Sequence, residues 1–169
     1  MSAVSRERIR KEHAQRGPHK LARAFSRVPI TIRQLEPSDA DALNSHLLHL
    51  DKAARHMRFR GMSDGAVSNH AAHCLACATV YGAFDDDHLC AVAELFDSEV
   101  AFSVDGAYRQ QGLGKRLFAR VLEAARAAHL AAVKMDVLPE NTAMRRLARA
   151  FGTNFTFEPG MLSGTCNVA

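Results

Sequence analysis

Hydrophobic and polar positions along the chain alternate in two periods, which divide it into strand-like and helical segments. Apolar residues at helical spacing predict helices at 38–50, 113–128 and 140–152 and a split helical segment over 51–60 and 63–74. Short runs rich in β-branched and aromatic residues predict strands at 30–33, 78–84, 89–96, 99–104, 132–138, 154–158 and 161–168. We therefore predict a mixed α/β domain in which about four helices cover a central sheet of about six or seven strands.

A glycine-bearing turn joins the strand at 99–104 to the helix at 113–128, and it reads Arg109-Gln110-Gln111-Gly112-Leu113-Gly114. Amide groups at a helix entrance lack partners within the helix and carry partial positive charge, so they suit an anion. Glycine lets a phosphate approach the backbone and permits a positive φ. The turn therefore predicts a phosphate site, although a glycine that only allows tight packing would give the same local pattern.

Two motifs together favour the phosphate interpretation. Arg109, Gln110, Gly112 and Gly114 resemble motif A of the GNAT superfamily of N-acetyltransferases, and the segment 140–152, with Asn141 after a strand and at a helix start, resembles a second element of that superfamily. The resemblance extends from about residue 30 to about residue 158, and the family members it favours are bacterial protein-lysine acetyltransferase-like domains. It implies the GNAT fold, in which a splayed strand pair, here 99–104 and 132–138, forms the acyl-CoA cleft.

The resemblance also assigns residues to the cofactor, acetyl-CoA, which would be a co-substrate. The strand before the turn would hold pantetheine through its backbone, although ordinary ladder pairing is the alternative. Asn141 would contact the cofactor, and it is equally suited to cap a helix. The cofactor-binding residues implied are Phe102, Ser103, Val104, Arg109, Gln110, Gln111, Gly112, Leu113, Gly114, Lys115 and Asn141.

Acetyl transfer to an amine requires a base, because an ammonium ion has no lone pair. Glu99 stands where relatives acting on protein lysine carry a glutamate with this role, and Glu94 on the preceding strand is the competitor. Strand alternation places Glu99 and Ser103 on the face opposite Phe102. A solvated or paired surface charge remains the alternative for either glutamate.

The chain departs from the family in one respect, since its only tyrosines are Tyr81 and Tyr108. Many relatives carry a tyrosine beyond the position of Asn141 that protonates the leaving thiolate. Here that proton would come from water or from one of three side chains, namely Ser163, Thr165 and Cys166. The departure leaves open a non-catalytic acyl-CoA sensor or adaptor.

The predicted function is an acetyl-CoA-dependent N-acetyltransferase in which a primary amine attacks the thioester directly. The acceptor would be a protein lysine or a small-molecule amine, and the alternative is the acyl-CoA-binding adaptor. Family members often form dimers, so a homodimer is a further expectation.

Charge is unevenly distributed along the 169 residues. Residues 1–27 carry a net charge of +6 and the remainder −2, so we divide the chain into a basic N-terminal extension, 1–27, and a GNAT domain, 28–169. The extension lacks the apolar core of a secretory signal, and no stretch is long enough to span a membrane. We expect a cytoplasmic protein with neither a membrane nor a specific nucleic acid as its partner.

Four potential metal ligands lie within eight residues, at His70, His73, Cys74 and Cys77. Zinc can use such a set, but the second ligand pair of a zinc finger is absent. The interpretation preferred from sequence is the end of a helix with buried thiols, and no metal is expected. No base partner of the cysteines is evident in the sequence, which disfavours transfer through a cysteine acyl-enzyme.

Overall fold

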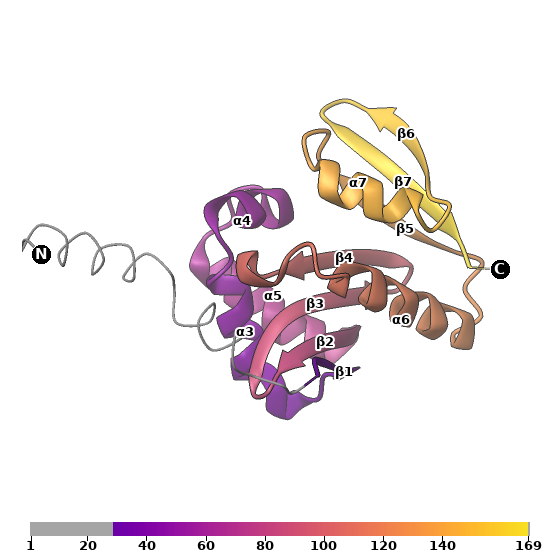
Figure 1. The fold of residues 1–169 in the computed structure, drawn as a ribbon. Helices are drawn as coiled ribbons and strands as arrows, with labels where there is room; N and C mark the ends of the chain where they lie inside the picture. Colours follow the sequence, from indigo (N-terminus) through magenta and orange to yellow (C-terminus); the bar gives the residue numbers. More distant parts are fainter. Residues whose placement is uncertain (1–28, 169) are drawn as a thin grey trace, which may run out of the picture.

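The computed structural model describes residues 29–168, which form a mixed sheet with helices on both faces (Figure 1). The predicted basic extension, 1–27, lies outside the described residues. The strands are β1 (Thr31–Gln34), β2 (Thr79–Asp85), β3 (His88–Phe96), β4 (Glu99–Val104), β5 (Ala132–Val137), β6 (Asn154–Glu158) and β7 (Met161–Asn167). The helices are α3 (Ala40–Leu48), α4 (Lys52–Phe59), α5 (Asp64–Cys77), α6 (Leu113–Ala127) and α7 (Thr142–Arg149), with short 3-10 turns η1 (Pro37–Asp39) and η2 (Gly106–Tyr108).

The sheet has the strand order β1-β2-β3-β4-β5-β7-β6. Every neighbouring pair is antiparallel except β4 and β5, which are parallel and in register only at Glu99 and Lys134. The Lys134 amide donates to the Ser98 carbonyl at 2.7 Å. From there β4 continues to pair with β3 as far as Val104, while β5 pairs with β7. The predicted splay between β4 and β5 is confirmed.

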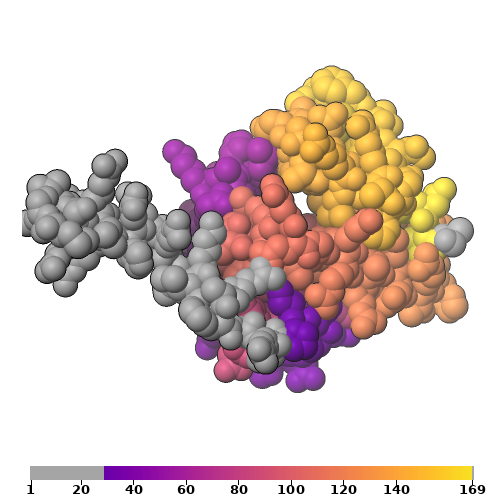
Figure 2. All heavy atoms as spheres, viewed as in Figure 1, coloured from indigo at the N-terminus to yellow at the C-terminus, as the bar shows by residue number. Residues whose placement is uncertain are grey.

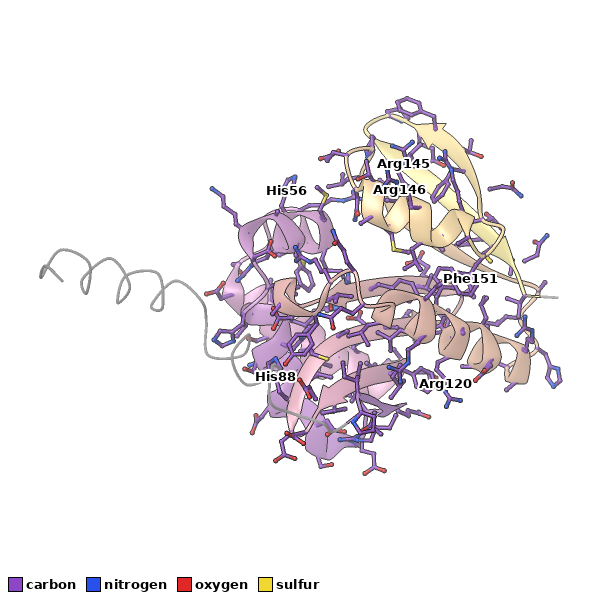
Figure 3. The ribbon with its side chains drawn as sticks, in the orientation of Figure 1. His56, His88, Arg120, Arg145, Arg146 and Phe151 are labelled. Carbon is purple, nitrogen blue, oxygen red and sulfur yellow. The ribbon has the colours of Figure 1, made fainter. Side chains whose placement is uncertain are left out.

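Two hydrophobic cores lie on opposite faces of the sheet. The first packs α6 and α7 against the sheet, where the fully buried Phe118 stacks on Phe102 at 5.1 Å and on Phe151 at 4.4 Å between ring centroids. Figure 3 shows Phe151, just beyond α7, reaching toward α6. The second packs α3, α4 and α5 against β2 and β3, with Leu43 and Val67 fully buried. Alternation along β3 supplies both cores, as strand geometry requires.

Local caps set the ends of the helices on the second face. The Asp51 carboxylate accepts from the Ala54 amide at 2.9 Å at the start of α4, and the Ser63 hydroxyl accepts from the Ala66 amide at 3.3 Å at the start of α5. Arg60, in the left-handed conformation, ends α4. These caps separate α4 from α5, so the predicted split segment is confirmed as two helices. The described residues therefore contain five α-helices, where about four were predicted.

Helix α5 runs three residues beyond its predicted end and reaches Cys77. Cys74 is buried as predicted, but Cys77 is exposed, so the prediction of a helix end with buried thiols is correct for one of the two cysteines. None of the helices in residues 29–168 combines the length and the apolar character that crossing a membrane requires.

Candidate active site

The entrance to α6 has the backbone geometry that the sequence indicates. Gly112 is the N-cap residue, with a φ of 79°, and apart from Gly112 and its two chain neighbours nothing lies within 4 Å of the position that a Cβ would occupy there. Close packing therefore does not explain Gly112, whereas its backbone conformation does. Gly114 differs, because a Cβ at that position would lie 3.0 Å from a methyl carbon of Leu147 on α7. Gly114 therefore allows α6 and α7 to pack closely.

Most polar side chains around this turn form hydrogen bonds or ion pairs within the protein, which stabilise the loop. The Arg109 guanidinium forms an ion pair with Asp51 and donates from Nε to the Val104 carbonyl at 3.2 Å. The Gln111 amide nitrogen donates to the Ala107 carbonyl at 3.0 Å. Lys115 is exposed in the first turn of α6, so it is available to an anion there. The Arg109 guanidinium thus links the loop to Asp51, the N-cap of α4.

The side chains of β4 point alternately toward the two hydrophobic cores. Beyond Glu99, its backbone edge faces the gap that opens toward β5. Phe102 packs in the first core, whereas Ser103 is buried on the opposite face beside His46 of α3. The His46 Nε2 atom and the Ser103 hydroxyl share a hydrogen bond of 2.9 Å, and the His46 Nδ1 atom lies 3.2 Å from the Leu89 carbonyl oxygen. Because a carbonyl only accepts, Nδ1 carries the proton and the hydroxyl donates to Nε2. Burial lowers the pKa of His46 to about 4, so the imidazole is neutral.

Asn141 serves as the N-cap of α7. Its side-chain oxygen accepts from the Met144 amide at 3.0 Å, which confirms the capping alternative. Nearby, His56 Nε2 of α4 lies 3.9 Å from a carboxylate oxygen of Glu140, the residue before Asn141 (Figure 3). The second motif and α4 therefore approach each other across the end of the splayed strands.

A cleft of about 700 Å³ lies on the α4–α5 side of the sheet, where β4 and β5 part. The surface is also hollowed between the β4–α6 region and the α7 region (Figure 2). Cleft residues come from α4, α5, β3, β4, β5 and the β6–β7 hairpin. The charged and hydrogen-bonding side chains among them are Arg58, Arg60, His70, His73, Cys74, Glu94, Glu99, Lys134, Asp136, Glu158 and Ser163. The two predicted catalytic glutamates are both in this set.

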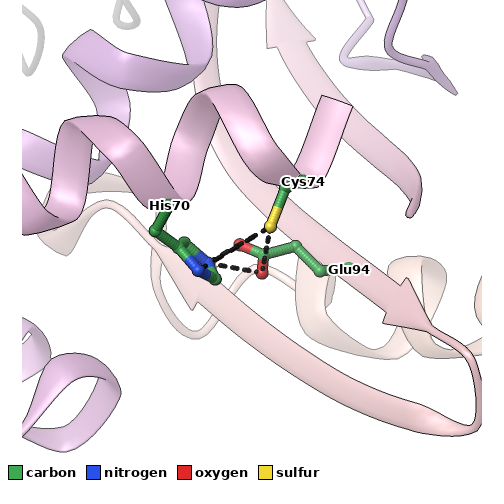
Figure 4. A group of neighbouring side chains, drawn as sticks. All are labelled: His70, Cys74 and Glu94. Carbon is green, nitrogen blue, oxygen red and sulfur yellow. Dashed lines mark hydrogen bonds and ion pairs between the residues drawn. The ribbon is translucent and has the colours of Figure 1, made fainter. Parts of the chain in front are cut away.

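Glu94 lies at the buried end of the cleft and is fully engaged (Figure 4). Its carboxylate forms an ion pair with Arg58, lies 3.0 Å from His70 Nε2, and accepts from the Cys74 thiol at 3.3 Å. Burial alone would raise the pKa of Glu94, but the Arg58 charge and the contacts with His70 and Cys74 outweigh it and hold that pKa below its ordinary value. Glu94 is therefore an ionised, paired carboxylate.

Glu99 has different surroundings. It begins β4, it is exposed, and it lines the same cleft at the point where β4 and β5 are last in register. Its face of β4 is the Ser103 face, as alternation predicts, and Phe102 lies on the other. A solvent-accessible carboxylate at the cleft suits accepting a proton from an ammonium group, either directly or through water.

Both tyrosines lie away from the cleft. The Tyr108 hydroxyl donates to Asp85 at 2.9 Å, and Tyr81 packs against the first core. Of the three side chains that sequence left as proton donors, Ser163 lines the cleft, whereas the Cys166 thiol is buried and donates to the Phe151 carbonyl at 3.1 Å.

Sequence reasoning missed the neighbours of Cys74. Its thiol lies 3.3 Å from His70 Nε2, one helical turn earlier, and beside Glu94 from β3. The spacing of four residues between His70 and Cys74 was a usable signal for a shared helix face. Nothing local pointed to Glu94 or Arg58. Burial and the Glu94 charge raise the pKa of Cys74 to about 12, so the thiol is protonated.

Comparison with known proteins identifies the family. The sequence model of the acetyltransferase (GNAT) family matches residues 64–153, which include β4, the glycine turn and α7. The chain belongs to the GNAT family. No curated protein is matched by sequence.

Solved GNAT structures share the fold at low identity. The GNAT domain of S. lividans PAT superposes with a TM-score of 0.70 at 20% identity, covering 82% of this chain and 90% of that one. YncA of Salmonella typhimurium, solved with acetyl-CoA, gives 0.65 at 19% identity, with 84% and 95% covered. The PaiA N-acetyltransferase of Thermoplasma acidophilum, solved with coenzyme A, gives 0.68 at 14% identity, with 83% and 99% covered.

Proposed function

We propose that this GNAT protein transfers an acetyl group from acetyl-CoA to a primary amine by direct attack of the amine on the thioester. The observation that carries the proposal is the α6 entrance, which follows β4 at the open end of its splay from β5, while a cleft with carboxylates is lined by the beginning of the same strand. The cofactor would enter from one side of the splay and the acceptor amine from the other.

Several features of the α6 entrance fit acetyl-CoA. The open space around Gly112 and its φ of 79° leave the first amides of α6 accessible to a diphosphate. Lys115 adds a charge in the same turn. The remaining proposed contacts are the backbone of 102–104 for pantetheine, and Arg109, Gln110, Gln111, Leu113, Gly114 and Asn141 around the diphosphate. When bound, acetyl-CoA supplies the activated acyl group.

Glu99 is the proposed base. A bound ammonium must lose a proton before it attacks, and the exposed carboxylate of Glu99 is accessible to the amine or to a bridging water. Glu94, the second candidate, is occupied by Arg58 and buried, which favours Glu99. Direct attack is favoured over an acyl-cysteine because the pKa of Cys74, the cysteine lining the cleft, is raised by burial to about 12. Ser163 or water would protonate the leaving thiolate.

The acceptor is proposed to be a cationic amine, either a protein lysine or a small molecule. Apart from the Glu94–Arg58 pair, the cleft is lined by three carboxylates, Glu99, Asp136 and Glu158, and by two cations, Arg60 and Lys134, and this excess of carboxylates attracts an ammonium group. A cytoplasmic location is proposed on the basis of four free cysteines.

The test measures release of free CoA thiol by the full-length chain against a panel of small amines and lysine-bearing proteins. Glu99→Gln should lower kcat about 10²- to 10⁴-fold and leave acetyl-CoA affinity unchanged. Glu123→Gln is the matched control, because Glu123 is an exposed glutamate on α6 that pairs with Arg120 at 2.9 Å, and it should keep full activity. Equal activity of Glu99→Gln and the parent would remove Glu99 from the mechanism.

A non-catalytic acyl-CoA-binding adaptor is the second candidate, favoured by the absence of a tyrosine from the cleft residues. Tight acetyl-CoA binding with no thiol release from any acceptor in the panel would support the adaptor and contradict the enzyme.

A further inference from the structure

We propose that His70, Cys74 and Glu94 form a binding site for a divalent transition-metal ion, with Zn²⁺ as the preferred occupant. His70 and Cys74 are one turn apart on the same face of α5, and Glu94 reaches them from β3 (Figure 4). One ligand atom from each lies within 4.8 Å of the others. Imidazole nitrogen, thiolate sulfur and carboxylate oxygen are the three ligand types that zinc accepts.

This site differs from the four-residue run that sequence suggested. The His73 ring lies against the Phe96 ring, with 5.4 Å between centroids, and Cys77 is exposed at the last residue of α5. The tertiary structure replaces both of them with Glu94, which lies on β3, 20 residues after Cys74 in the chain.

The distances within the cluster are close to those of a coordinated ion. His70 Nε2 lies 3.0 Å from Glu94 Oε2 and 3.3 Å from Cys74 Sγ, and the sulfur lies 3.3 Å from the same oxygen. Tetrahedral zinc with ordinary bond lengths would hold such atoms about 3.3 to 3.6 Å apart. The three ligands therefore need to separate by only a few tenths of an ångström.

Without a metal, three hydrogen-bond donors crowd one carboxylate oxygen. Arg58, His70 Nε2 and the Cys74 thiol all contact Glu94 Oε2. His70 Nε2 also lies 3.0 Å from a guanidinium nitrogen of Arg58, which can only donate, so a protonated Nε2 meets a second donor beside the oxygen that it contacts. An ion that accepts lone pairs from nitrogen, sulfur and oxygen together would take the place of the His70 and Cys74 protons.

Arg58 opposes the ion, because its guanidinium contacts the same oxygen of Glu94. Binding therefore requires Arg58 to leave that oxygen. The Cys74 thiolate, formed as the metal binds, supplies a second negative charge beside Glu94. All three ligands line the cleft, so a fourth coordination position would be reached from the cleft and could hold water.

Binding must displace the thiol proton, since the thiolate is the ligand. At pH 7 we expect about one proton to be released per ion bound, measured by calorimetry in buffers of different ionisation enthalpy. Release of no proton would overturn thiolate coordination.

The decisive experiment uses the full-length reduced chain and Co²⁺ as a spectroscopic substitute for Zn²⁺, without acetyl-CoA. One equivalent of Co²⁺ should produce a thiolate-to-cobalt charge-transfer band, and Zn²⁺ should displace it. Cys74→Ser should abolish the band, and His70→Gln should weaken Zn²⁺ binding by at least about 100-fold.

The matched controls are Cys77→Ser and His73→Gln, which change the same residue types on the same helix. Both should bind as the parent does. Circular dichroism without metal checks that each variant folds. If Cys74→Ser does not fold, the Zn²⁺ affinity of His70→Gln decides whether the site exists. The proposal is overturned if the parent gives no band, if Cys77→Ser abolishes it, or if His70→Gln binds Zn²⁺ as tightly as the parent. None of these results depends on acetyl transfer.

Discussion

The two sides of the splayed strands are built in opposite ways. The proposed cofactor side is local and uses backbone, because β4, the glycine turn and α6 are consecutive in the chain and present amides. The proposed acceptor side uses side chains from separate elements, with Arg58 on α4, His70 on α5 and Glu94 on β3 meeting in one cluster. A site made of consecutive backbone groups leaves a sequence motif, whereas a site made of converging side chains leaves almost none.

The largest expected effect tests the local side. Gly112→Val would strain a backbone with a φ of 79° and place a branched side chain in the space beside the helix amides. Loss of two charge-assisted hydrogen bonds, worth about 3 to 6 kcal/mol together, should weaken coenzyme A binding by about 10² to 10⁴-fold in calorimetry.

Gly160→Val is the matched control for this substitution. Gly160, in the turn between β6 and β7, has a φ of 76° and equally open surroundings. The Gly160→Val variant should lose stability through the same backbone strain but should bind coenzyme A as tightly as the parent does. Unchanged affinity in Gly112→Val would contradict a diphosphate site at the α6 entrance.

The next largest effect is a pH dependence of stability, and it tests the hydrogen bond that joins His46 of α3 to Ser103 of β4. The pKa of His46 is lowered to about 4 by burial, compared with 6.5 for the ordinary group. Between these values the unfolded chain binds the extra proton and the folded chain does not, so stability falls as pH drops from 6.5 to 4. The loss should be roughly 3 kcal/mol by pH 4.

Urea denaturation at a series of pH values measures this slope. His46→Gln should flatten it over that window, although the variant itself is less stable at pH 7. His49→Gln, an exposed position one turn from His46, should retain the parent slope. If His46→Gln retained the full slope, the acid sensitivity would belong to other groups.

The smallest expected effect separates two roles of Asn141. Asn141→Ala removes the cap of α7 and should cost about 1 kcal/mol of unfolding free energy, and Asn141→Ser should recover most of that loss. If Asn141 also contacts the cofactor, both variants should bind coenzyme A less tightly than the parent does. Ser63→Ala, which removes the cap of α5, should show a similar loss of stability with normal binding. Normal binding in both Asn141 variants would leave Asn141 with the capping role alone.

Much of the fold was predictable because it depends on local patterns. Periodicity and caps located the seven strands and the split helices, and errors were confined to ends, such as the extra turn of α5 up to Cys77. The glycine turn was also predictable, since its conformation is fixed by Gly112 itself. The roles of its side chains were less so, because Arg109 is held by Asp51, a residue far away in sequence.

The sequence by itself determined the family, the order of elements and the α6 entrance, because these follow from hydrophobic period, capping residues and a glycine whose backbone needs no partner. Only the tertiary structure distinguished Glu94 from Glu99, although both glutamates lie on neighbouring strands and line the same cleft. Packing of α4 and α5 over β3 buries Glu94 with Arg58, His70 and Cys74 and leaves Glu99 exposed at the cleft. The charge state and partners of a carboxylate depend on what is packed around it, and that arrangement is not encoded near it in the chain.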